Sequence, residues 1–121
     1  MHHAAKAYGM VAQQTASPRD LEAQLLLRAA SRLQSVHDDW EGQRSALDHA
    51  LLFNRKLWTV FLTSVTNQDN PLPADLRQNI ANIGIFVMNH TLNVINNPQP
   101  ERLRSLININ RNLAAGLGGR A

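Results

Sequence analysis

Apolar residues recur every three or four positions along most of the chain, which is the spacing of a helix with a buried face. The pattern predicts four long helices over residues 17–38, 45–66, 73–96 and 98–115, and a short helix over residues 1–15. No stretch alternates apolar and polar residues as a half-buried strand does. Long helices with short connections favour an all-α fold, an antiparallel four-helix bundle with an additional short N-terminal helix.

Capping residues and prolines set the expected helix boundaries. Ser17 is a preferred N-cap, and Pro18 suits the first turn of a helix. The prolines of the sequence NPLP separate the second long helix from the third, because proline interrupts helical hydrogen bonding. Asn97 and Pro98 predict the start of the last helix. Several glycines near the C-terminus predict a frayed tail over residues 116–121.

The helix predicted over residues 73–96 is unusual because no charged residue occurs between Arg77 and Glu101. At about 100° per residue, its amides and one aromatic ring fall within about one third of the helix circumference. This amide face consists of Asn79, Asn82, Phe86, Asn89, Asn93 and Asn96. Two apolar flanks cover the remaining circumference, and we expect both to be buried. One flank carries Leu76, Ile80, Ile83, Val87 and Val94, and the other carries Ala81, Ile85, Met88, Leu92 and Ile95.

An uncharged polar face suggests a surface that is covered part of the time. Solvated helix faces usually carry Lys, Glu and Arg, which are better helix formers than Asn. Asn both donates and accepts hydrogen bonds, so it can pair with a partner without a charge being desolvated. With Phe86 as an apolar anchor, the face is a candidate docking surface for an amphipathic helix. The other interpretation is an ordinary solvent-facing side of a bundle.

Composition favours one folded domain over residues 1–121, with 44% hydrophobic and 17% charged residues. The absence of cysteine excludes disulfides, thiolate metal sites and cysteine nucleophiles. The histidines lack metal-ligand spacing, and no catalytic motif occurs, so we expect no metal, no cofactor and no enzyme activity. No apolar run is long enough to span a bilayer and no signal core is present, which favours a cytoplasmic protein without membrane insertion.

Two further hypotheses concern the ends of the chain. Tyr8 is the one large apolar residue of the predicted N-terminal helix, which is either a displaceable lid over a groove or a permanent part of the core. Arg102, Arg104 and Arg111 make the last helix locally basic, which favours an RNA contact. Scarce aromatic residues and the lack of an RNA-recognition signature weigh against that contact.

Four segments, in their order and spacing, resemble one protein family. They are AAKAY (4–8), TASPRDLEAQLL (15–26), NRKLWTVF (54–61) and NPLPADLRQNIANIGIFV (70–87). Together they resemble the flagellar biosynthesis regulator FlaF, and the likeness covers almost the whole chain. The resemblance implies a small helical cytoplasmic protein that works on flagellin, the filament subunit. We therefore expect it to bind flagellin and to support its synthesis or secretion as an export chaperone or regulator.

The resemblance also implies an alternative and a second partner. In the alternative, the protein is a post-transcriptional regulator that acts on flagellin mRNA, directly or with the regulator FlbT. FlbT is therefore a candidate partner beside flagellin. The resemblance assigns no binding residue, so the residues of the amide face come from this sequence alone.

Overall fold

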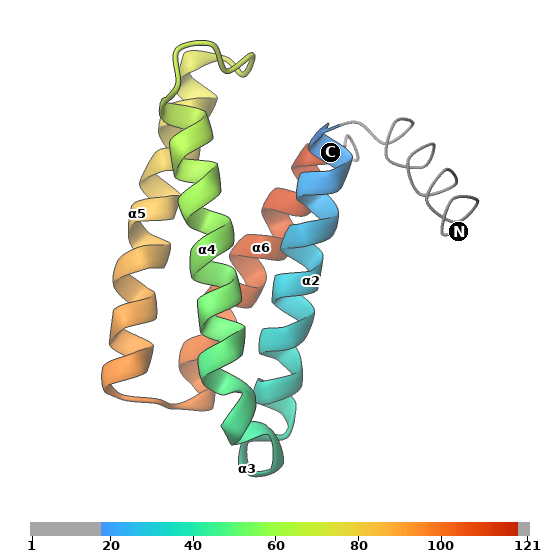
Figure 1. The fold of residues 1–121 in the computed structure, drawn as a ribbon, viewed down its shortest axis with the longest axis vertical. Coiled ribbons are helices and arrows are strands. Elements are labelled where there is room, and N and C mark those ends of the chain that lie inside the picture. Colours follow the sequence, from blue (N-terminus) through green and yellow to red (C-terminus); the bar gives the residue numbers. More distant parts are fainter. Residues whose placement is uncertain (1–17, 119–121) are drawn as a thin grey trace, which may run out of the picture.

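The computed structural model describes residues 18–118, and these residues are almost entirely helical (Figure 1). Its long helices are α2 (Pro18–Asp38), α4 (Leu47–Thr66), α5 (Ala74–Asn96) and α6 (Arg104–Leu117). Its short helical segments are α3 (Trp40–Gln43), η1 (Arg44–Ala46) and η2 (Pro100–Leu103). No strand occurs within the described range, so the predicted all-α class with four long helices is confirmed there. The predicted helix over residues 1–15, with Tyr8, lies outside the described residues.

The last helix begins later than predicted. Residues 97–99 are not helical, Pro100 occupies the start of η2, and α6 begins only at Arg104. Asn97 and Gln99 each precede a proline, and a residue before proline is driven out of the helical region by the proline ring. Gln99 accordingly has an extended backbone, with φ −147° and ψ 140°.

The other end of α6 also departs from the prediction. The helix continues through Gly116 to Leu117, so the predicted frayed tail is wrong at its first two positions. Residues 119–121 lie outside the described part of the chain.

The connection after α2 contains a short helix that the sequence pattern did not predict. The carboxylate of Asp39 accepts a hydrogen bond from the backbone N–H of Gly42 at 3.2 Å, which caps the start of α3. The Arg44 guanidinium lies 5.2 Å from the centre of the Trp40 ring and holds the turn from the other side. Four residues with one cap are too short to show a helical repeat.

The long helices pack as two pairs (Figure 1). α2 packs most extensively on α6, α4 packs on α5, and contacts between α2 and α4 join the two pairs. α5 has no comparable packing against α2 or α6, so it is an outer helix. Gly84 permits the close approach of α5 to α4, because a Cβ atom there would lie 2.5 Å from Cδ2 of Leu62.

A buried polar chain links α4 to α6 inside the mainly aliphatic core. The indole Nε1 of Trp58 donates to Oδ1 of Asn110 at 2.9 Å. The Nδ2 of Asn110 donates in turn to Oδ1 of Asn54 at 2.6 Å. All three side chains are fully enclosed, so these bonds fix the register of the two helices.

Candidate partner-binding surface

The amide face of α5 lies open to solvent. The buried residues of α5 are Ile80, Gly84, Val87, Thr91 and Val94, which share one side of the helix at three- and four-residue spacings. The five asparagines of the amide face lie on the opposite side, and all of them are exposed. The helix is therefore anchored along one narrow stripe.

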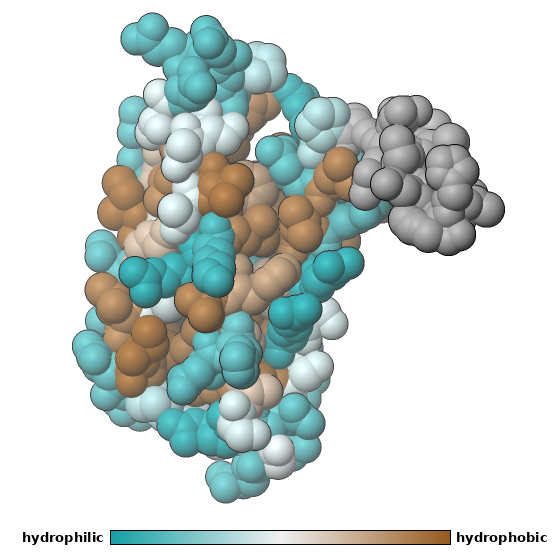
Figure 2. Space-filling view, viewed as in Figure 1, coloured by the Kyte–Doolittle hydropathy of each residue, from teal (hydrophilic) through white to brown (hydrophobic). Residues whose placement is uncertain are grey.

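The expectation that both apolar flanks of α5 are buried is wrong. Ile85, Leu92 and Ile95 of the second flank are 56%, 52% and 48% exposed. On the first flank, Leu76 and Ile83 are also exposed. The reason is that α5 packs closely against α4 alone, and one neighbour cannot cover both sides of a helix. Figure 2 shows the resulting brown apolar areas on the α4–α5 side of the molecule.

Phe86 is held in place by a residue that the sequence did not single out. Its ring stacks on His90, with centroids 5.2 Å apart and planes 11° from parallel. The Nε2 atom of His90 lies 2.7 Å from the carbonyl oxygen of Arg102, so it carries the proton and donates. Phe86 nevertheless remains 46% exposed, which leaves an oriented aromatic surface beside the amides. The four-residue spacing of Phe86 and His90 is the signal that could have identified the pair.

The amide side chains are largely free of bonds to the rest of residues 18–118. Gln78 donates through Nε2 to Oδ1 of Asn82 at 3.0 Å, one turn along the helix. The other asparagines of the amide face have no side-chain hydrogen bond to a described residue, and none is sealed against the backbone. Their donors and acceptors therefore face water.

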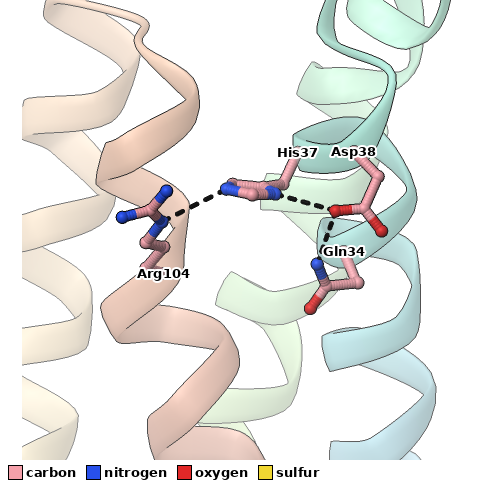
Figure 3. A network of polar contacts seen from close by, with 4 residues as sticks. All are labelled: Gln34, His37, Asp38 and Arg104. Atoms are coloured by element: carbon pink, nitrogen blue, oxygen red, sulfur yellow. Dashed lines mark hydrogen bonds and ion pairs between the residues drawn. The ribbon is translucent and has the colours of Figure 1, made fainter.

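The arginines that favoured an RNA contact are partly engaged within the molecule. Arg104 donates through Nε to Nε2 of His37 at 3.3 Å (Figure 3). Because Nε2 of His37 accepts, Nδ1 carries the proton and donates to Asp38 at 2.9 Å. Arg102 donates to Oε1 of Gln99 at 3.4 Å. Of the three, Arg111 is exposed and has no such side-chain bond to a described residue.

The same network affects the carboxyl group of Asp38. The hydrogen bond from His37, and then that from Gln34, lower the pKa of Asp38 below its ordinary value (Figure 3). The end of α2 is therefore a polar junction with α6. Of the three arginines, Arg104 is hydrogen-bonded in this junction, whereas Arg111 is not.

A cleft of about 430 Å³ lies between the two helical pairs, where α2 begins and α4 ends. Its walls are mostly apolar and include Phe61, Leu72, Ile80, Leu113 and Leu117. Burial in this cleft raises the pKa of Glu22, and the nearby Arg19 partly opposes that shift. No cluster of three or more metal-binding side chains occurs within residues 18–118.

The described residues define a small all-helical protein whose outer helix, α5, carries no charged residue after Arg77 and leaves apolar side chains exposed. The chain belongs to the FlaF family, because the family model described as flagellar protein FlaF matches residues 4–117. The resemblance carried by the sequence segments is thus confirmed, and membership marks a flagellar protein. No curated protein and no solved structure matches the chain. Within residues 18–118, the helices are too short or too polar to cross a membrane.

Proposed function

We propose that this FlaF-family protein binds unassembled flagellin in the cytoplasm and supports its synthesis or secretion, as an export chaperone or regulator. The proposed action is binding without catalysis. The amphipathic ends of flagellin tend to associate, and the amide face of α5 would cover one of them until delivery. FlbT is the second partner that we propose, as a protein that acts together with this one on flagellin supply.

The observation that carries the proposal is the open amide face with its oriented aromatic ring. A helix that served only the fold would not need the exposed ring of Phe86, stacked on His90. Unpaired amides can bond polar side chains of an incoming helix without the cost of removing a charge from water. An anchor ring surrounded by such amides is the arrangement expected for helix recognition.

Release requires an intermediate affinity, and the uncharged face suits that requirement. Close charge pairs at an interface can couple strongly and hold two proteins together for long times. Hydrogen bonds between neutral amides are weaker, and water replaces them when the partners separate. The surface can thus hold flagellin and still pass it to the export apparatus.

The test replaces the centre of the amide face and measures flagellin binding. We expect Asn82→Lys with Phe86→Glu to abolish co-purification of flagellin while the helical circular dichroism stays unchanged. Gln24→Lys with Leu27→Glu is the matched control on α2, because Leu27 is 48% exposed and Phe86 is 46% exposed. Equal flagellin binding by the face variant and the wild type would remove α5 as the docking surface.

Regulation through flagellin mRNA predicts a different measurement. Binding to flagellin leader RNA would fall steeply with added salt, because phosphate contacts release counterions. The internal bonds of Arg104 and Arg102 favour the protein partner over RNA. A clear RNA shift at low salt, lost in Arg111→Glu, would reverse that preference.

A further inference from the structure

The exposed flank of α5 has the spacing of a coiled-coil seam. Its positions alternate between three- and four-residue steps, as the a and d positions of a heptad do. These positions, which we term the α5 seam, are Gln78, Ala81, Ile85, Met88, Leu92 and Ile95. In the structure Ala81 and Met88 are half-buried against the core, whereas the three remaining apolar residues are about half exposed. The core covers only part of the seam and leaves Ile85, Leu92 and Ile95 exposed.

The two borders of the seam differ in a way that leaves one side open. Gly84 and Thr91 border it towards α4, and both are buried. Asn82, Asn89 and Asn96 border it on the other side, at seven-residue spacing, and all are exposed. A second helix lying along the seam would therefore meet amides on its outer edge.

α4 extends the apolar surface beside the C-terminal half of the seam. Leu52 of α4 is 44% exposed and lines a shallow groove between α4 and α5. The groove is also lined by Asp48, Leu51, Arg55, Thr91 and Ile95. A helix resting on the seam would cover Leu52 as well. The complete surface is thus one stripe of α5 with a contribution from α4.

We propose that the α5 seam pairs with the α5 seam of a second copy of this chain, in an antiparallel two-fold dimer. Identical faces repel each other when they carry charges of one sign, but the α5 seam carries no charged residue. Asp48 and Arg55, in the groove beside it, are of opposite sign. Amides both donate and accept, so an amide border can pair with an identical border. Antiparallel pairing also places opposite ends of the helix dipoles beside each other.

One heptad register sets the exposed Ile85 opposite the exposed Ile95 of the second copy, and we choose it for the dimer. The two-fold axis then crosses the seam at the level of residue 90, and Met88 lies opposite Leu92 of the second copy. Each contact occurs twice, as a two-fold interface requires. Asn89 meets its own counterpart close to the axis, and Asn82 lies near Asn96 of the second copy.

The size of the seam predicts a weak and reversible dimer. From Gln78 to Ile95 the seam is about 27 Å long at about 1.5 Å per residue. One helical stripe of that length buries less than the roughly 800 Å² per partner of a typical stable complex. The dimer should therefore form at high concentration and dissociate on dilution. This inference goes beyond the proposed function and does not depend on it. The dimer would cover Asn82, Asn89 and Asn96 of the amide face, so the second copy and flagellin would compete for them.

Analytical ultracentrifugation of the full chain tests the proposal without flagellin. We expect the mass to rise from 13.5 kDa towards twice that value between about 5 μM and 500 μM. Ile85→Lys with Leu92→Lys should keep the chain monomeric over this range, with unchanged circular dichroism. Val60→Lys is the control, since Val60 is 66% exposed on α4 and does not belong to the seam. A wild type that stays monomeric throughout, or a control that dissociates as the seam variant does, overturns the proposal.

Single cysteines give an independent geometric test, because the chain contains no cysteine of its own. Asn89→Cys should form a disulfide-linked dimer on mild oxidation, since the two copies of position 89 meet at the axis. Asn79 is also exposed on α5 but lies neither in the seam nor on its border, so Asn79→Cys should cross-link at least tenfold more slowly. Equal cross-linking at both positions overturns the antiparallel arrangement. If the wild type stays monomeric and the seam variants no longer co-purify with flagellin, the seam binds flagellin and not a second copy.

Discussion

α5 and α6 both carry apolar residues at helical spacing, yet they use them differently. Six large hydrophobic side chains of α5 are at least 36% exposed, whereas none of α6 is. α6 lies against α2, and its apolar residues enter the core at Leu106, Ile107 and Ala114. α5 packs against α4 alone and buries one stripe. The apolar content of α6 serves the fold, while much of that of α5 remains available for binding.

The largest effect should come from matched leucine truncations in the two helices. Leu106→Ala in α6 should lower the free energy of unfolding by about 2–5 kcal/mol, because it leaves a cavity at a fully buried position. Leu92→Ala in α5 should change it by no more than about 0.5 kcal/mol, since Leu92 is 52% exposed. Urea denaturation of both variants at one protein concentration measures the difference. Similar losses for the two variants would contradict the contrast between the helices.

Matched glycine substitutions should act in opposite directions. Gly84→Ala places a Cβ atom against Leu62, so we expect a loss of about 1–3 kcal/mol despite the better helix propensity of alanine. Gly116→Ala meets no atom within 4 Å and should stabilise α6 by less than about 1 kcal/mol. Thermal unfolding by circular dichroism measures both changes. A stabilised Gly84→Ala variant would mean that α5 can move away from α4 at little cost.

The smallest effect concerns Glu22, in the cleft between the two pairs. Burial raises the pKa of Glu22, so its charged form disfavours folding. The pKa of Glu22 is higher in the folded protein than in the unfolded chain. The folded protein therefore has its full stability from this group below the pKa of the unfolded chain, and loses it as pH rises through the pKa of the folded protein. Glu22→Gln should therefore stabilise the protein slightly at pH 7, within about 0.5 kcal/mol, and have no such effect near pH 3. The difference in urea midpoint between variant and wild type, measured at both pH values, gives the sign. A variant less stable than the wild type at pH 7 would show that the carboxylate has a favourable partner there.

The helices were predictable because their boundaries depend on local chemistry. Pro18 opens α2 as expected, and α5 follows the prolines before Ala74 within one residue of the predicted start. The start of the last helix was predicted too early, because Pro100 keeps Gln99 extended and the helical segment η2 begins only at Pro100, ahead of α6. The short helix α3 was not predicted, because the only local feature that favours it is the capping bond between Asp39 and Gly42.

Surface exposure on α5 could be predicted only in part. The uncharged amide face was predicted to be a surface that is covered only part of the time, and its five asparagines are exposed in the structure. The exposure of Ile85 and Leu92 could not be read from periodicity, which shows that a flank is apolar but not whether a neighbour covers it. The four-residue spacing of Phe86 and His90 allows their rings to meet, but the bond that orients His90 depends on where Arg102 lies in the fold. The binding roles of these residues stay predictions.

The pairing of α2 with α6 brings the first and last described helices together, with Asp20 and Gly118 bordering the same groove. A nascent chain emerging from the ribosome therefore exposes α2 without its main packing partner until residues 104–117 have been made. During that interval α4 and α5 can already pair as a local hairpin, because they are adjacent in sequence. Synthesis thus completes the unit that carries the amide face before it completes the rest of the core.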